Sequence, residues 1–210
     1  MTLKRIGIIG YGALGLQMEH FIWEQAAGQD IIFFYFDDKL LAEKKKNAYP
    51  FNSFINDEFI DLDFYIGLGY YHLQLKSNII RQLKENNFRS PPLIHKSSFI
   101  HSTAEIGAGA CIYPMCNIGI FTKIADGVLI NNSVTISHDS IIGTGTFISP
   151  GAILSGRVEI GENCFIGSGV IISNDVKIGD NVTVGIGSVI SKNVESNSSV
   201  IGNPMKLIKK

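Results

Sequence analysis

The sequence IHKSSF-IHSTAE-IGAGAC-IYPMCN-IGIFTK, residues 94–123, shows the repeat that decides the fold. An Ile, Leu or Val returns at every sixth position from Ile94 to Ile190, which gives 17 hexads without an insertion. A small or β-branched residue follows four positions after each of them, from Ser98 to Val194. A period of six fits neither an α-helix nor one long strand, and it is typical of short strands joined by tight corners. The pattern therefore predicts a parallel β-helix.

The corners of this β-helix are expected at the third and fourth positions of each hexad. The fourth position holds Gly six times, Asn three times and Asp twice in the 17 hexads, and these residues tolerate a positive φ. Three hexads would form one triangular coil of 18 residues, so the repeat region makes a little under six coils. The Ile side chains and the small residues would fill the narrow interior.

Composition excludes several classes of protein. The net charge is −1 and Lys and Arg are scattered, which argues against a nucleic-acid-binding surface. No apolar run approaches the ~20 residues that span a membrane, and the N-terminus does not resemble a secretory signal. Three cysteines argue against a disulfide framework, and Cys116 and Cys164 occupy inward positions of their hexads. We expect a cytoplasmic protein.

Residues 1–92 lack the hexads and have a different rhythm. Apolar segments at 4–9, 31–36 and 63–68 predict parallel strands, and helical patterns follow the first and the third. Pro91-Pro92 marks the boundary with the repeat region, residues 93–210. The prediction is a small open α/β sheet, half of a doubly wound nucleotide-binding fold.

Three segments should meet at the carboxyl edge of this sheet, where open sheets bind ligands. Gly10-Tyr11-Gly12-Ala13-Leu14-Gly15 matches the dinucleotide fingerprint, and the alternative is a tight strand-to-helix turn in which glycine only relieves crowding. The second and third strands end at Asp37-Asp38 and at Gly69. Asp37 or Asp38 could bind a base or a ribose, or could be a solvated turn. One half-fold leaves no room for a nicotinamide, so a different nucleotide diphosphate fits better.

One corner of the repeat carries acid–base chemistry. His138-Asp139 takes the third and fourth positions of its hexad, so both side chains should point outward. An unperturbed histidine, with a pKa of ~6.5, can accept a proton near neutrality, and an adjacent carboxylate can orient it. The alternative is a surface histidine. Gly156, one coil further, would expose an amide that could stabilise an oxyanion.

The surroundings of this corner suit a long, thin acyl carrier. The edge continues through Asn174 and Lys192, and a neighbouring edge carries Pro150, Ser168 and Ile186. The remaining histidines do not converge, so we expect no metal site.

The chain resembles the bacterial nucleotide-sugar N-acetyltransferases of the bacillosamine-biosynthesis type, which are related to the sialic acid O-acetyltransferases. The resemblance covers nearly the whole chain. Besides the glycine loop, it rests on these segments: Phe36-Asp37-Asp38, residues 66–69 (IGLG), 93–97 (LIHKS), 137–143 (SHDSIIG), 161–167 (GENCFIG) and 201–204 (IGNP).

The resemblance implies a left-handed β-helix and a homotrimer with acetyl-CoA, and no metal, between adjacent prisms. The acetyl group would go to the amine of a nucleotide-linked amino-deoxy sugar, a UDP- or dTDP-4-amino-4,6-dideoxy sugar, in surface glycan biosynthesis. By the family pattern, the catalytic residues are His138 as general base, Asp139 and Gly156. The sugar nucleotide would contact Gly12, Ala13, Leu14, Asp37, Asp38 and Gly69, and acetyl-CoA would contact Phe147, Ser168 and Ile186.

The chain departs from that pattern at several positions. Ala13-Leu14 replaces a glycine–histidine pair, Phe147 stands where relatives often have a second histidine, and Asp139 replaces a glutamate. The segment after Gly69 is longer than usual. Two other functions stay open: O-acetylation of sialic acid or another sugar, and a non-catalytic nucleotide-binding trimeric scaffold.

Overall fold

The computed structural model describes residues 3–26 and 28–208, and the chain divides into two compact units between Leu93 and Ile94. The first unit has the α/β pattern and the second has the hexads.

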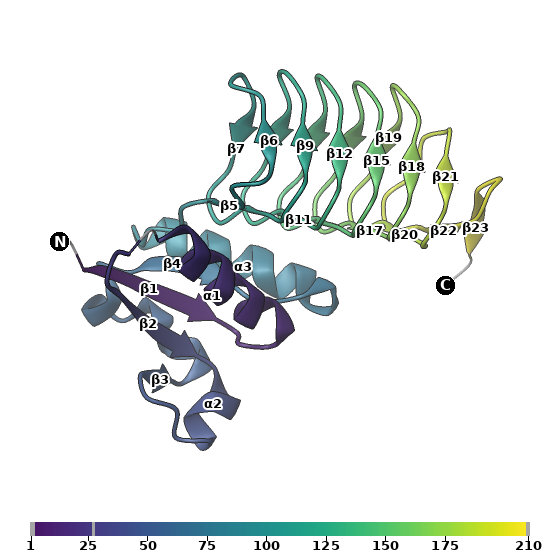
Figure 1. Ribbon diagram of the computed structural model, residues 1–210. Coiled ribbons are helices and arrows are strands. Elements are labelled where there is room, and N and C mark those ends of the chain that lie inside the picture. Colours follow the sequence, from purple (N-terminus) through teal and green to yellow (C-terminus); the bar gives the residue numbers. More distant parts are fainter. Residues whose placement is uncertain (1–2, 27, 209–210) are drawn as a thin grey trace. The chain divides into compact units, whose positions relative to one another are not determined.

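The first unit is a four-stranded parallel sheet with the strand order β3-β2-β1-β4. The strands are β1 (Lys4–Ile9), β2 (Ile31–Phe36), β3 (Ala48–Tyr49) and β4 (Asp63–Ile66). The helices are α1 (Ala13–Gln25), α2 (Asp38–Ala42) and α3 (Leu73–Glu85), with three 3-10 helices, η1 (Phe51–Ile55), η2 (Asp57–Phe59) and η3 (Tyr70–His72). Helices α1 and α3 pack against β1 and β4 (Figure 1).

The register of this sheet brings three strand ends to one edge. Ile9 is paired with Phe36 on one side and with Ile66 on the other, so β1, β2 and β4 end together. The three strands and two long helices confirm the predicted pattern. The sequence pattern missed α2, β3 and the 3-10 helices, because short elements carry too little periodicity to be recognised.

The second unit is a parallel β-helix of stacked triangular coils (Figure 1). One sheet contains β7 (Glu105–Ile106), β10 (Lys123–Ile124), β13 (Ile141–Ile142), β16 (Glu159–Ile160) and β19 (Lys177–Ile178). The next contains β6 (Phe99–Ile100), β9 (Asn117–Ile118), β12 (Thr135–Ile136), β15 (Ile153–Leu154), β18 (Ile171–Ile172) and β21 (Val189–Ile190). The third contains β5 (Leu93–Ile94), β8 (Cys111–Ile112), β11 (Leu129–Ile130), β14 (Phe147–Ile148), β17 (Phe165–Ile166), β20 (Thr183–Val184), β22 (Ser199–Ile201) and β23 (Lys206–Ile208).

The 18-residue coil is confirmed by the strand pairing. Ile124 pairs with Ile142, and Ile142 pairs with Ile160, each 18 positions on. The first residue of each hexad points inward and, together with the small residues, forms a continuous buried core from Ala110 to Val200. Buried aliphatic side chains of this kind contribute roughly 1.5–3 kcal/mol each, so the stack supplies its own stability.

The corners fall at the third and fourth hexad positions, as predicted. The fourth residue has a positive φ in every hexad from Gly109 to Gly187. This includes Met115 (φ 61°), Phe121 (φ 56°) and Arg157 (φ 58°), whose side chains disfavour that conformation. The coil geometry therefore imposes the positive φ even where the side chain does not favour it.

Two of the three outer faces differ in chemistry. The charged face, formed by the sheet of β7 to β19, presents Glu105, Lys123, Ile141, Glu159 and Lys177. Two ion pairs link neighbouring coils on it, with Nζ–Oε1 distances of 3.4 Å for Lys123–Glu105 and 2.9 Å for Lys177–Glu159. The apolar face, formed by the sheet of β6 to β21, presents uncharged side chains: Phe99, Asn117, Thr135, Ile153, Ile171 and Val189.

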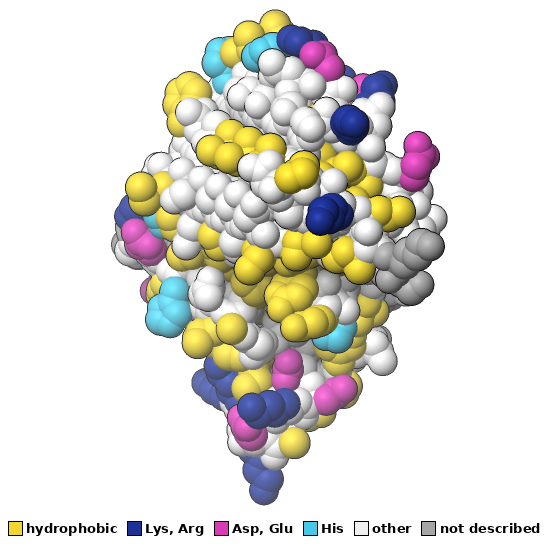
Figure 2. All heavy atoms as spheres, turned by 90° about the vertical axis from the view of Figure 1, so that its right-hand side faces the viewer, with side chains coloured by type: hydrophobic (Ala, Val, Ile, Leu, Met, Phe, Trp, Pro, Cys, Tyr) yellow, Lys and Arg dark blue, Asp and Glu magenta, His cyan; other side chains and the backbone are white. Residues whose placement is uncertain are grey.

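Charge is distributed without a large area of one sign on the side of the molecule drawn in Figure 2, where Lys and Arg side chains occur close to Asp and Glu side chains. None of the helices in residues 3–26 and 28–208 has the length and apolar composition that would let it cross a membrane.

Candidate active site

The glycines of the loop after β1 meet the steric requirements of the dinucleotide fingerprint. Gly10 adopts a positive φ of 78°, and a Cβ on Gly15 would lie 2.4 Å from the Gly10 carbonyl oxygen, so only glycine lets α1 approach the strand. A Cβ on Gly12, in contrast, would meet no described atom within 4 Å. In the dinucleotide fingerprint the three glycines serve the turn, the approach of the ligand and helix packing. Gly12 is therefore the open position of the loop.

The end of β4 lies against the same loop. A Cβ on Gly67 would lie 2.3 Å from the Gly10 carbonyl oxygen, and one on Gly69 would lie 3.5 Å from Leu14 Cδ1. Two of the three predicted segments, Gly10–Leu14 and Gly69, are thus brought together.

Asp37 joins this cluster through the backbone of the loop. Its Oδ2 accepts a hydrogen bond of 2.8 Å from the Tyr11 amide, and its Oδ1 accepts from the amides of Lys39 and Leu40, both at 3.0 Å. Asp37 is the N-cap of α2, and its carboxylate ties the glycine loop to the end of β2. Asp38 Oδ1 accepts a bond of 2.9 Å from the Phe51 amide. The two aspartates are structural anchors, and their role toward a ligand stays a prediction.

Sequence reasoning missed the part played by the Tyr11 side chain. Its hydroxyl donates to Glu19 Oε2 on α1, and the Tyr35 hydroxyl donates to Glu19 Oε1 at 3.0 Å. Lys45 Nζ lies 4.2 Å and 4.0 Å from the centroids of the Tyr11 and Tyr35 rings. Burial and the nearby Glu19 carboxylate raise the pKa of both tyrosines. These contacts fix the loop from its outer side.

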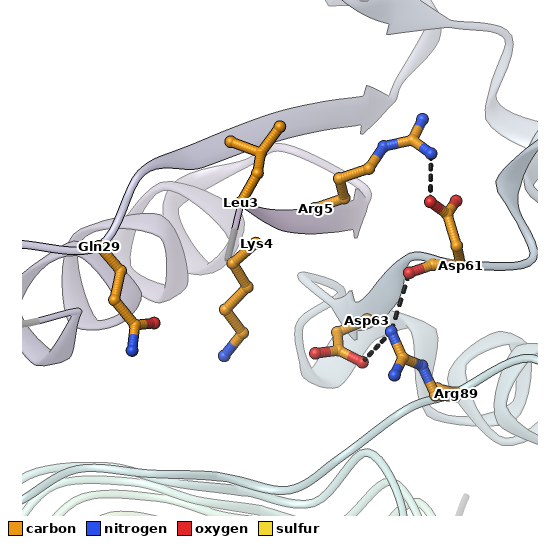
Figure 3. Close-up of a pocket in the computed structure, with 7 residues that line it drawn as sticks. All are labelled: Leu3, Lys4, Arg5, Gln29, Asp61, Asp63 and Arg89. Atoms are coloured by element: carbon orange, nitrogen blue, oxygen red, sulfur yellow. Dashed lines mark hydrogen bonds and ion pairs between the residues drawn. The ribbon is translucent and has the colours of Figure 1, made fainter. Parts of the chain in front are cut away.

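A hollow of the first unit lies at the amino-terminal ends of β1 and β4, opposite the ends that carry the predicted site residues (Figure 3). It has a volume of about 310 Å³, and its arginines already have partners. Arg89 donates to the Asp61 carbonyl oxygen at 2.8 Å and to Asp63 Oδ1 at 3.2 Å, and Arg5 pairs with the Asp61 carboxylate. Because the charge of both arginines is neutralised by these carboxylates, we assign no ligand to the hollow.

His138 and Asp139 form a bonded pair on one corner of the β-helix. His138 Nδ1 lies 2.7 Å from Asp139 Oδ2, and the side chains are 45% and 48% exposed. The sequence could place the two residues side by side, but only the structure shows that their side chains meet. If Nδ1 donates to the carboxylate, Nε2 of the neutral ring carries a lone pair that can accept a proton.

Gly156 lies directly beside the His138 ring. A Cβ at Gly156 would lie 2.4 Å from Nε2 and 2.6 Å from Cε1 of the imidazole. Because Gly156 has no side chain, the Nε2 side of the imidazole can lie against it.

The expected bare amide at Gly156 is wrong. The Gly156 N–H donates to Asn174 Oδ1 at 2.8 Å, one coil further along the edge. The same bond recurs elsewhere, since Ala108 donates to Asp126 Oδ1 at 2.9 Å and Glu162 to Asp180 Oδ1 at 2.8 Å. Corner amides in this coil are thus regularly bonded by a side chain 18 positions later in the sequence. The catalytic role of Gly156 stays a prediction.

Ser168 and Ile186, two of the residues predicted to hold acetyl-CoA, lie on a different edge from His138. The His138 edge (corners 138–139, 156–157 and 174–175) lies between the apolar and charged faces. The Ser168 edge (corners 150–151, 168–169 and 186–187) lies on the other side of the apolar face, and both Ser168 and Ile186 are exposed there. Phe147 is on the third sheet, where its ring centroid lies 6.0 Å from that of Phe165. Within one prism the structure does not bring His138 together with Ser168.

The histidines of the first coils have local partners. His95 Nδ1 lies 2.8 Å from Ser97 Oγ, and His101 Nδ1 lies 3.0 Å from Thr103 Oγ1. Both stand at the second hexad position rather than at the corner, where His138 stands.

Comparison with known proteins agrees with this architecture. Residues 94–203 match the family described as the GMPPB C-terminal domain. The acetyltransferase domain of PglB from Neisseria gonorrhoeae is 28% identical with a TM-score of 0.77, over 98% of this chain and all of that one. PerB from Caulobacter crescentus, solved with CoA and GDP-perosamine, is 21% identical with a TM-score of 0.86, over 98% and 97% of the two chains. WeeI from Acinetobacter baumannii is 22% identical with a TM-score of 0.86, over 99% and 100%.

These likenesses confirm the predicted fold, a small α/β unit followed by a left-handed parallel β-helix. The likeness to the PglB domain also agrees with the predicted resemblance to acetyltransferases.

Proposed function

The chain belongs to the GMPPB C-terminal domain family through residues 94–203. From the likeness to the PglB acetyltransferase domain and from the His138–Asp139 pair, we propose an acetyl transfer in which His138 is the general base. The protein is an acyltransferase that uses acetyl-CoA as co-substrate and acetylates the amine of a nucleotide sugar. The bonded His138–Asp139 pair beside Gly156 is the observation that carries the proposed role of the base.

The reaction follows from the geometry of this corner. The sugar amine attacks the thioester carbonyl, a C–N bond forms and the C–S bond breaks. Nε2 of His138 takes the proton that the amine loses and passes it to the departing CoA thiolate. Asp139 holds Nδ1 and stabilises the imidazolium while it exists. A positioned base of this kind contributes ~10² to 10⁴ in rate.

The oxyanion of the tetrahedral intermediate needs a donor. We propose the Gly156 amide for this role, on the condition that the Asn174 carboxamide turns away from it when substrates bind. Asn174 is exposed, so its side chain is free of packing constraints that would prevent the turn. A single donor of this type is worth ~10² to 10³ in kcat.

The nucleotide sugar is proposed to bind at the carboxyl edge of the first unit's sheet. Gly12 offers the open backbone, and Ala13 and Leu14 begin α1, whose N-terminal amides favour a phosphate. Asp38 and Gly69 would contact the rest of the ligand, whereas Asp37 acts by holding the loop through the Tyr11 amide.

We further propose a homotrimer with the active site between subunits. In a single prism the apolar face lies between the His138 edge and the Ser168 edge. One copy therefore carries the predicted base and the predicted acetyl-CoA contacts on different edges. If a second copy packs against the apolar face, its Ser168 edge can approach the first copy's His138 edge. The exposed Phe99, Ile153 and Ile171 on that face favour such burial over the charged face.

One set of measurements tests the proposal. We expect CoA release with UDP-, dTDP- or GDP-linked amino sugars. The nucleotide sugar that gives the highest kcat/KM identifies the nucleobase of the natural substrate. Light scattering should give the mass of a trimer. Acetylation of free sialic acid instead would favour O-acetyl transfer, and failure to bind acetyl-CoA in calorimetry would favour the non-catalytic scaffold.

A further inference from the structure

Three charged residues stand in line on the His138 edge. Asp139, Arg157 and Asp175 occupy the fourth position of hexads that are one coil apart, with positive φ values of 57°, 58° and 64°. The flanking strands β13, β16 and β19 pair in register, so the three corners stack at the inter-strand spacing of ~4.8 Å. Arg157 therefore has one carboxylate on each side.

Arg157 pairs with only one of these two carboxylates. Its Nε donates to Asp175 Oδ1 at 2.6 Å and its Nη2 donates to Oδ2 at 3.0 Å, a bidentate arrangement. Its backbone amide donates to the His138 carbonyl oxygen at 2.9 Å, which fixes it beside the pair. Asp139 is left to His138 Nδ1 at 2.7 Å.

Both neighbouring carboxylates act electrostatically on Arg157, and Asp175 has the larger effect. The Asp175 carboxylate, and to a smaller extent that of Asp139, raises the pKa of Arg157. In return, the hydrogen bond from Arg157 lowers the pKa of Asp175. The next charges nearby are the mutually paired Glu159 and Lys177 on the adjoining face and Lys192 further along the edge.

We propose that Asp175 is a positioning residue, which holds the Arg157 guanidinium away from Asp139 and so keeps the Asp139 carboxylate on His138. Without Asp175, the closest carboxylate for Arg157 on this edge is Asp139, and a bidentate arginine would compete with the imidazole for it. The effect on catalysis rests on the proposed function of His138, but the effect on the hydrogen bond does not.

The test is a double-mutant cycle. Asp175→Asn keeps a residue that tolerates positive φ and removes the charge, so the corner should fold as before. We expect this variant to lower kcat by about three- to fivefold, a size typical of an exposed ion pair. Arg157→Gln alone should have a kcat near that of the wild type. Adding it to Asp175→Asn should restore kcat, because no guanidinium is left to compete with His138 for the Asp139 carboxylate.

Glu159→Gln is the matched control, because it also removes an ion pair between residues 18 apart, on the adjoining face. It should leave kcat unchanged. If Asp175→Asn has wild-type kcat, or if Arg157→Gln fails to rescue it, the proposal is overturned.

A second readout needs no turnover. In ¹⁵N-labelled protein, the two ring nitrogens of His138 report the bond from Nδ1 to Asp139 through their chemical shifts. We expect these shifts to change in Asp175→Asn and to return in the double variant. Unchanged ring shifts in Asp175→Asn would refute the inference even in an active enzyme, and the expected changes would support it even if the chain proved inactive in acetyl transfer.

Discussion

Replacement of Gly156 by alanine tests the geometry of the proposed base most directly. The added Cβ would lie 2.4 Å from His138 Nε2, whereas ordinary contacts between heavy atoms are ~3.5–4.0 Å. The ring must therefore retreat by roughly 1 Å, and a displacement of that size can lower the rate by ~10². We expect Gly156→Ala to reduce kcat by about that factor.

The same variant should remain folded. Gly156 does not belong to the described glycines with positive φ, so alanine fits the backbone, and the half-exposed His138 side chain can move toward solvent. The free energy of unfolding should change by less than about 1 kcal/mol, measured by urea denaturation. Steady-state CoA release gives kcat.

Gly145→Ala is the control. Gly145 lies on the third edge, which carries neither His138 nor Ser168, and it has a positive φ of 71°. Its alanine variant should lose about 1–2 kcal/mol of stability and keep its kcat. If Gly156→Ala turns over normally, or if its loss of kcat comes with an equal loss of folded protein, the placement of His138 in the reaction is refuted.

Three further outcomes are expected. His138→Ala should lower kcat by at least ~10² while light scattering finds the oligomer unchanged; near-normal turnover would remove His138 from the mechanism. Asp37→Ala removes the acceptor for three backbone amides, so it should lower the stability of the first unit by about 1–2 kcal/mol and weaken sugar-nucleotide binding in calorimetry; unchanged values of both would show that the carboxylate does not hold the loop. Burial raises the pKa of the Cys164 thiol to about 11. The thiol ionises at lower pH in the unfolded chain than in the folded one, so the stability that the buried thiol contributes is present below pH ~9 and is lost as the pH rises through about 11. Between pH 8 and pH 10 the free energy of unfolding, measured by denaturant titration, should therefore fall less in Cys164→Ala than in the unmodified chain. Equal falls would contradict this assignment.

The fold was predictable because its signals are repeated or strongly periodic. The Ile at each sixth position fixes which side chains point inward, and 18-residue pairing follows from three hexads per coil. The glycine loop was predictable for a similar reason, because Gly10, Gly12 and Gly15 each meet a separate steric requirement. These signals depend on local sequence alone.

The site was only partly predictable, because its hydrogen bonds join residues that are distant in sequence. The sequence places Gly156 beside His138, but it does not say that Asn174 occupies the Gly156 amide. It places Asp37 at a strand end, but the bond to the Tyr11 amide appears only when β1 and β2 are paired. The choice of Arg157 between two carboxylates depends on side-chain rotamers, which no spacing reveals.

The positive φ at Met115, Phe121 and Arg157 has a consequence for how such a chain can acquire new chemistry. Because backbone ladders between neighbouring coils hold each corner in shape, the outward residue there need not be a glycine, and almost any side chain can be displayed. New reactive groups can therefore be introduced along the edges, at a cost of about 1–2 kcal/mol where a corner glycine is replaced, while the interior stays the same. In engineering terms, the corners are the positions at which this scaffold would best accept a different catalyst or a different binding specificity.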